Sequence, residues 1–321
     1  MERKHLIVIS RKIMFSVLTL IYAAVAFTQA TFAWITLNNE TFLRDAELSI
    51  MNDSGLYLSL NGLDYKTNLT NEDIKNALES NILGDVTTTD GINFYDKENK
   101  LLEPLDNYIS FTLWVKTYDP TVKELFLVEN VTEKINYQTA LENEIDGTFV
   151  VSKGINWMSD IDFTYGKENI KKGSINFFEA ANAIRIAVVE ENLDEEFEVS
   201  KKEDLIRFIY DPSENKEMGF GVPTGAYEYG KIKNNDDSLP TVFPNTKYSL
   251  STFKNPYLAN NDNSVCAKFQ ETKDEFGAPC YYTKVTVNIW LEGWDADCFD
   301  AILGDKLLIQ LKFRGSSLTE L

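Results

Sequence analysis

The segments Tyr281–Glu292 (YYTKVTVNIWLE) and Lys306–Arg314 (KLLIQLKFR) decide the fold class of this 321-residue chain. In each segment apolar side chains alternate with polar ones, which is the period of a strand that buries one face. The predicted core faces carry Val285, Val287, Ile289 and Leu291 in the first segment and Leu307, Ile309, Leu311 and Phe313 in the second. We therefore predict two strands that each bury one face and expose the other, as antiparallel sheets do.

Earlier segments repeat this pattern. Tyr108–Thr117 (YISFTLWVKT) alternates in the same way, and Lys123–Glu129 (KELFLVE) follows it after the turn signal Asp119-Pro120. A short turn between two such segments predicts neighbouring strands. Ala183–Glu190 (AIRIAVVE) predicts a further strand.

Residues 47–60 carry a hairpin signal. Glu47–Ile50 and Leu56–Leu60 flank the sequence Asn52-Asp53-Ser54-Gly55, which has the composition of a tight turn. Two strands separated by such a turn commonly pair with each other. We therefore predict a hairpin here.

Helical signals are few. Thr70 or Asn71 is placed to cap a helix over Glu72–Glu79, which has acidic residues in its first turn. Lys202–Phe208 is compatible with a short helix or a strand. Together with the strands, these signals predict an all-β, mainly antiparallel fold, a β-sandwich or jelly roll with short helices and long loops.

A loop-rich insertion is expected around residues 211–263, which are rich in Gly, Pro, Asn and Asp. It contains Gly219–Gly225 (GFGVPTG). We predict no helix directly after this glycine-rich stretch, and a phosphate-binding loop needs one. We therefore expect no phosphate site there.

Charge and composition exclude several function classes. The chain has 31 basic and 50 acidic residues, a formal net charge of −19. A nucleic-acid-binding face needs clustered Lys and Arg, so we expect no nucleic-acid partner. The single histidine is His5, in the N-terminal segment. The rest of the chain therefore has no imidazole for Ser-His-Asp or Cys-His catalysis, or for a His-ligated metal.

The N-terminus has the order of zones found in a secretory signal peptide. Basic residues between Arg3 and Lys12 precede the apolar stretch Ile13–Phe27, and small and polar residues follow. Cleavage is expected after Ala30 or Ala33, and Ala24-Val25-Ala26 offers a third position.

The alternative is an uncleaved leader, with residues 13–33 anchoring the chain in a membrane. Either way, residues 1–33 form a signal peptide or anchor, and residues 34–321 form an exported domain. The expected location is extracellular or at the cell surface, with a signal peptidase and the cell envelope as partners.

Export bears on the three cysteines. Cys266 and Cys280 flank a short polar loop, so a disulfide between them is the favoured prediction outside the cytosol. Cys298 would then be left over. A different pairing, or three reduced thiols, are the alternatives that the sequence leaves open.

The acidic residues Glu292, Asp295, Asp297 and Asp300 form the candidate metal site. Closely spaced carboxylates can supply several of the six to eight oxygens that Ca²⁺ takes, although the spacing is not that of an EF-hand. The same residues are equally compatible with a solvated turn. A third alternative is a pair of glycosidase carboxylates, with Trp290 and Trp294 nearby to stack on sugar. No other cofactor is expected.

Two short blocks resemble a known family. They are Ala30–Thr36 (ATFAWIT) after the apolar leader, and Val287–Phe313, with Ile289–Gly293 (IWLEG) and Asp295–Cys298 (DADC). They are similar to the leader junction and C-terminal block of exported proteins of Firmicutes and Mollicutes, related to the TasA and camelysin group. The resemblance implies a jelly-roll subunit trimmed by a dedicated signal peptidase. It also implies fibre assembly, in which an N-terminal strand is donated to the next subunit. The chain contains no His-Glu-x-x-His, so we expect no zinc protease.

These observations lead to three functional hypotheses. The first is a structural or adhesive surface protein, such as a biofilm fibre or matrix subunit that self-assembles by strand exchange through the arm Trp34–Leu43. The alternative is a surface-displayed β-sandwich that binds carbohydrate or another ligand. The third is a secreted hydrolase that uses carboxylates, although a non-enzymatic role is the favoured expectation.

Overall fold

The computed structural model describes residues 42–43, 46–53, 55–78, 82–96, 98–103, 107–130, 135–193, 205–235 and 239–318. All of them belong to a compact unit that spans residues 41–321. The predicted leader (1–33), its cleavage positions and most of the predicted arm lie outside the described residues. Of the arm, the structure describes Phe42 and Leu43.

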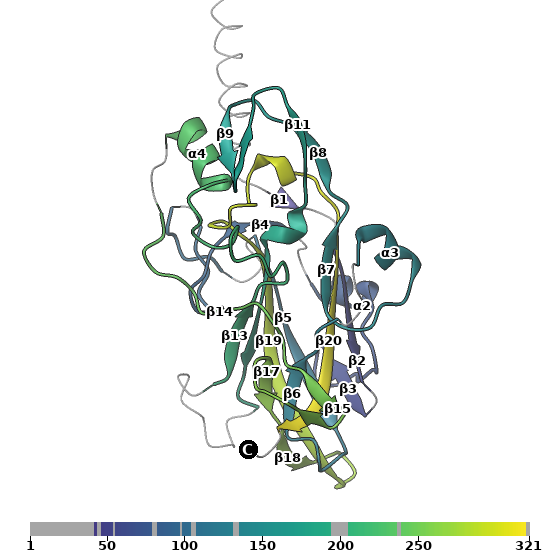
Figure 1. Ribbon diagram of the computed structural model, residues 1–321. Coiled ribbons are helices and arrows are strands. Elements are labelled where there is room, and N and C mark those ends of the chain that lie inside the picture. Colours follow the sequence, from purple (N-terminus) through teal and green to yellow (C-terminus); the bar gives the residue numbers. More distant parts are fainter. Residues whose placement is uncertain are drawn as a thin grey trace, which may run out of the picture. The chain divides into compact units, whose positions relative to one another are not determined.

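The first sheet is built around one long strand, β19, and is mixed in direction (Figure 1). Its central order is β3 (Leu56–Ser59), β5 (Ile109–Thr117), β19 (Pro279–Glu292), β12 (Ile184–Glu190), β13 (Arg207–Tyr210) and β14 (Thr246–Lys247). Short strands extend the two ends of β19, namely β18 (Gln270–Lys273) at the start, and β4 (Leu83–Val86) with β1 (Phe42–Leu43) at the end.

The second sheet is built around β20 (Leu307–Leu318). Its other strands are β2 (Glu47–Asn52), β6 (Glu124–Leu127), β7 (Phe149–Ser152), β15 (Phe253–Asn255), β16 (Leu258–Ala259) and β17 (Val265–Lys268). β2 runs parallel to β20 on one side, and β6 and β7 pair antiparallel with it on the other. Two small ribbons complete the strands, β8 (Ile155–Met158) with β11 (Ile175–Phe178) and β9 (Phe163–Tyr165) with β10 (Glu168–Ile170).

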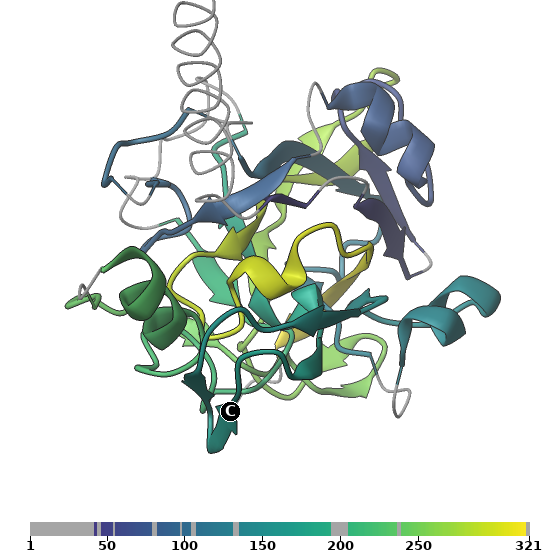
Figure 2. The ribbon, with the colours of Figure 1, turned by 90° about the horizontal axis from the view of Figure 1, so that it is seen from above.

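The two sheets face each other across one core. The side chains predicted for the core faces of β19 and β20 all lie in it, and each is at most 2% exposed. In the view from above, the strands fill the middle of the picture and the α-helices lie around them (Figure 2). The all-β sandwich with short helices is therefore confirmed.

Two predicted strand pairings are wrong. β2 and β3 do not form a hairpin, and β5 and β6 are not neighbours, because in each case the two strands lie in opposite sheets. The chain crosses the core at the turn after β2, where Lys312 and Arg314 of β20 bind the carboxylate of Asp53. These contacts hold the turn against the second sheet while the next strand enters the first.

The outer face of β19 is also not exposed as predicted. Asn288, Trp290 and Glu292 are 4%, 0% and 1% exposed, because the segment after β4, residues 87–96, covers the end of the strand. Phe94 from this covering segment packs edge-on against Trp290, with ring centroids 5.1 Å apart, and stacks on Tyr108. The covering segment creates a second small core outside the sandwich.

The helices are short. They are α2 (Asn71–Ala77), α3 (Tyr137–Glu142), α4 (Ala226–Asn234) and the 3₁₀ turns η1 (Ala180–Ala183) and η2 (Asp300–Ile302). α2 confirms the predicted helix, with Thr70 as the N-cap and Asp73 completing a capping box. The segment Lys202–Phe208 was predicted to be a helix or a strand. Its last two residues, Arg207 and Phe208, begin β13, and residues 202–204 lie outside the described part. The loop-rich region 211–263 contains α4, directly after the glycine-rich stretch, so the prediction of no helix there is wrong.

Candidate functional site

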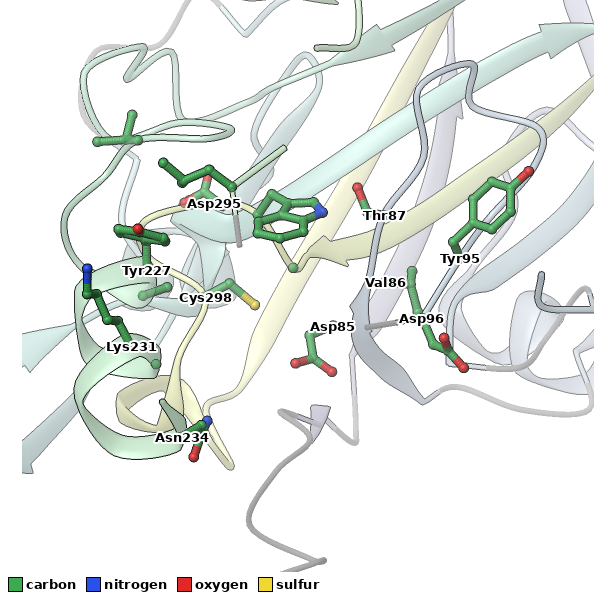
Figure 3. A pocket seen from close by; sticks show the side chains of 16 residues that line it. Asp85, Val86, Thr87, Tyr95, Asp96, Tyr227, Lys231, Asn234, Asp295 and Cys298 are labelled. Carbon is green, nitrogen blue, oxygen red and sulfur yellow. The ribbon is translucent and has the colours of Figure 1, made fainter. Parts of the chain in front are cut away.

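A pocket of about 130 Å³ opens at the end of β19 (Figure 3). On one side α4 supplies Tyr227, Lys231 and Asn234, and on the other the chain after β4 supplies Thr87 and Tyr95. The carboxylate of Asp85 lies between these two sides (Figure 3). The turn after β19 contributes Trp294, Asp295 and Cys298.

Gly225 brings α4 close to this turn. Its φ is +60°, and a Cβ at this position would lie 2.2 Å from the carbonyl oxygen of Ala296, so only glycine fits. The N–H of Gly225 donates to the carbonyl of Thr164, and the N–H of Ala226 donates to that of Ala296. Because two amides at the start of α4 are used in this way, the glycine-rich stretch does not form a phosphate cradle.

A buried ion cluster lies behind the pocket. Arg185 of β12 binds Asp211 at 2.9 Å and also pairs with Asp295, and all three side chains are at most 2% exposed. Burial lowers the pKa of Arg185, but the two carboxylates more than offset this, so the pKa is raised overall. The arginine therefore stays charged and offsets part of the negative charge of these buried carboxylates.

The four residues of the predicted calcium site do not converge. Asp295 pairs with Arg185, while Asp297 accepts a hydrogen bond from the Tyr165 hydroxyl. Glu292 accepts from the indole of Trp290 at 2.9 Å and from the backbone N–H of Trp294. The fourth carboxylate, Asp300, accepts from Lys233 and from the Tyr229 hydroxyl.

Among the described residues, no group of three or more His, Cys, Asp or Glu side chains is arranged to hold a metal ion. The physical reason is the tight turn after β19. The N–H of Asp295 donates to the carbonyl of Glu292, and the N–H of Cys298 donates to that of Asp295. Because of this turn, the carboxylates of Asp295, Asp297 and Asp300 bind different partners.

The predicted disulfide is not formed either. None of the three cysteines, all in the described part, is disulfide-bonded, and all three are buried. Cys266 of β17 lies in the core between the sheets. Cys280 lies two residues before Tyr282, on the outer face of β19, and interacts with its hydroxyl. The two thiols therefore face opposite sides of the first sheet, while Cys298 lines the pocket.

Burial raises the pKa of two acids beside the pocket. The pKa of Glu292 is raised to about 7, and the pKa of Asp297 to about 6. Burial likewise raises the pKa of Asp295 well above its ordinary value, although Arg185 opposes this. Glu292 and Asp297 therefore take up protons in a range where the described part has no histidine to titrate.

Glu292→Gln should flatten the dependence of stability on pH. The folded state holds the Glu292 proton more tightly than the unfolded chain does, so the stabilisation present near pH 5 is lost as the pH rises through about 7. We expect wild type to lose about 2 kcal/mol more than the variant between pH 5 and pH 7. Urea unfolding at both pH values measures this difference. Parallel losses in the two proteins would contradict it.

No family model, curated protein or solved structure matches this chain. The resemblance to the TasA and camelysin group therefore rests on the two sequence blocks alone. No helix among the described residues is long and apolar enough to cross a membrane.

Sequence reasoning missed most of the pocket. The sequence suggests Trp294 for stacking on sugar and Asp295 as a metal ligand, but it does not point to Asp85, Tyr95 or Tyr227. They lie far apart in the sequence and in no recognised motif. The sequence signal for this wall of the pocket is weak. It consists of the polar residues Asp85 and Thr87 on either side of the apolar Val86.

Proposed function

We propose that this chain is an exported surface protein that binds carbohydrate in the pocket between α4 and β4. The observation that supports the proposal is the combination of half-buried aromatic rings with polar side chains in one small cavity. Sugar rings present C–H faces that pack on aromatic rings and hydroxyls that need polar partners. Both kinds of partner line this pocket.

Three aromatic residues are available for stacking. Tyr95, Tyr227 and Trp294 line the pocket and are half-buried, so each ring has part of its surface open to a ligand. Trp290, which the sequence also suggested for sugar stacking, is fully buried under Phe94. We therefore assign stacking to Trp294 and exclude Trp290.

The polar residues set the orientation of the ligand. Asp85, Lys231 and Asn234 line the same pocket from its two sides. The carboxylate of Asp96 already accepts hydrogen bonds from the N–H groups of Glu98 and Lys100, so it mainly shapes the wall. Charged donors and acceptors form the stronger hydrogen bonds to hydroxyls.

The size of the pocket restricts the ligand. Its volume of about 130 Å³ is below the range of about 300–1,000 Å³ that holds a drug-sized molecule. It therefore suits one sugar unit, such as the end or a branch of a longer glycan that continues outside. A surface protein that holds such a unit would act as an adhesin.

A glycan array probed with the full-length chain tests this function, with Trp294→Ala and Tyr227→Ala as variants. We expect binding to a defined set of glycans and a loss of about tenfold or more in affinity for each variant. Tyr257→Ala is the matched control, because Tyr257 is 67% exposed and does not line the pocket. An array without signal, or equal losses in the control, would remove the support for the proposal.

The hydrolase alternative has less support. Glu292 and Asp297, two buried acids with raised pKa values, do not line the pocket. Asp295 does line it, but Arg185 binds its carboxylate. A glycosidase needs one acid and one base or nucleophile facing the same bond. We therefore favour binding without hydrolysis.

Fibre assembly by strand exchange is the second candidate. The end of the arm forms β1, which pairs with β4 of the same chain, and Leu43 is fully buried. In a fibre, a neighbouring chain would supply this strand. Strand donation uses this kind of contact, in which a strand such as β1 pairs with the edge of a sheet that is otherwise open.

Deleting residues 34–43 distinguishes the two arrangements. Because β1 pairs within the chain, we expect the deletion to destabilise the monomer, by about 2–5 kcal/mol for the loss of Leu43 alone. Thermal unfolding and electron microscopy of the purified protein measure the outcome. A stable monomer that has lost the ability to form filaments would instead establish strand exchange.

A further inference from the structure

A second pocket lies on the outer face of the first sheet, on the other side of the segment that covers β19. Its volume is about 460 Å³. Strands β5, β12 and β19 supply its floor through Ser110, Val189 and Asn288, and Arg207 of β13 lies at its rim. Ile92 and Tyr108 border it on the side of the covering segment. The lining residues of the two pockets do not overlap.

Asn288 carries a polar atom without a partner. The side chain is 4% exposed, and its Nδ2 donates to the carbonyl of Gly91 at 2.9 Å, which fixes the orientation of the amide. Its Oδ1 is buried, and no donor among the described residues reaches it. An unsatisfied buried acceptor costs about 1–3 kcal/mol, so a donor at the base of this pocket would be favoured.

Ser110 lies directly opposite Asn288 on the neighbouring strand β5. Side chains paired in this way have Cβ atoms about 4.5–5.5 Å apart, so one hydroxylated ligand can contact both. The Ser110 side chain is half-buried, lines the pocket and forms no hydrogen bond within the described part of the chain. The floor therefore presents two polar groups that the protein itself leaves unused.

Arg207 supplies a positive charge at the rim. It is exposed, lies opposite Val189 in the sheet and has no ion-pair partner among the described residues. The acids nearby are already engaged. Glu190 accepts the N–H groups of Ile206 and Lys268, and Glu191 pairs with Lys284 at 2.7 Å. The guanidinium is therefore available for a carboxylate, which it binds in a planar, two-pronged geometry.

We infer that this second pocket binds a small hydroxylated carboxylate of the sugar-acid type. The ligand's hydroxyls contact Ser110 and Asn288, and its carboxylate contacts Arg207. The volume of about 460 Å³ lies within the range of about 300–1,000 Å³ usual for small-molecule sites. This inference does not depend on carbohydrate binding in the first pocket.

Calorimetric titration of the full-length chain with glucuronate tests the inference, with glucose as the uncharged comparison. We expect one glucuronate per chain and an affinity for glucose weaker by about tenfold or more. Arg207→Gln should lower the affinity for glucuronate by about tenfold, and Ser110→Ala should lower it for both sugars. Neither side chain forms a hydrogen bond or an ion pair with the described residues, so both variants should fold.

Trp294→Ala locates the binding event, because Trp294 lines only the first pocket. We expect this variant to bind glucuronate as wild type does. The absence of any heat with glucuronate would overturn the inference. Equal binding of glucose and glucuronate, or unchanged affinity in Arg207→Gln, would overturn the assigned role of the carboxylate. Loss of binding in Trp294→Ala would assign the event to the first pocket instead.

Discussion

Replacing Arg185 with leucine should destabilise the protein by about 3–5 kcal/mol, because the substitution leaves Asp211 and Asp295 as buried charges without their cation. The guanidinium also donates to the carbonyl oxygens of Ile184 and Asn182, and these bonds are lost as well. Urea unfolding monitored by tryptophan fluorescence measures the change. An insoluble variant would agree with the upper end of this range.

Two further variants isolate the electrostatic part of that loss. Arg185→Lys keeps the charge but loses the forked geometry, so it should cost less than the leucine variant. Adding Asp295→Asn to Arg185→Leu removes one of the uncompensated charges and should recover part of the stability. If the double variant is no more stable than Arg185→Leu, the ion cluster does not explain the loss.

Ile289→Asp should prevent folding, or cost at least about 4 kcal/mol, because it places a carboxylate without a partner in the middle of the main core. Ile289 is fully buried on β19, with β5 on one side and β12 on the other. Ile309→Asp on β20, which is 2% exposed in the same core, should behave alike. Expression in soluble form and cooperative thermal unfolding are the measurements.

The chain offers a matched control for these two substitutions. Ile175 lies on β11 and is 62% exposed, so Ile175→Asp introduces the same charge into a strand without burying it. Its stability should stay within about 0.5 kcal/mol of wild type. If Ile289→Asp folds as cooperatively as Ile175→Asp does, the assignment of the core face on β19 is wrong.

The faces of the main strands could be predicted from the sequence, but their partners could not. Alternation along β19 and β20 identifies which side chains are buried, because a strand has a period of two. It does not say which sheet the next strand joins. That choice depends on contacts such as Asp53 with Lys312 and Arg314, which lie about 260 residues away along the chain.

The candidate site was less predictable for the same reason. The acids after β19 looked like metal ligands because their spacing is short, yet Asp295 binds Arg185, 110 residues away. The outer face of β19 looked exposed because nothing in its own sequence reveals the cover supplied by Phe94. Both features are tertiary, so local patterns could not show them.

The central claim is that the pocket between α4 and β4 binds a sugar unit, and NMR of the tryptophan side chains tests it most directly. The chain has five tryptophans, so their indole N–H signals can be resolved and assigned by substitution. Titration with the glycan that the array selects should shift the Trp294 signal, since this ring lines the pocket. The signal of Trp114, which lies on β5 opposite Lys284 and does not line the pocket, should stay in place. A saturable shift at Trp114 with none at Trp294 would contradict the account.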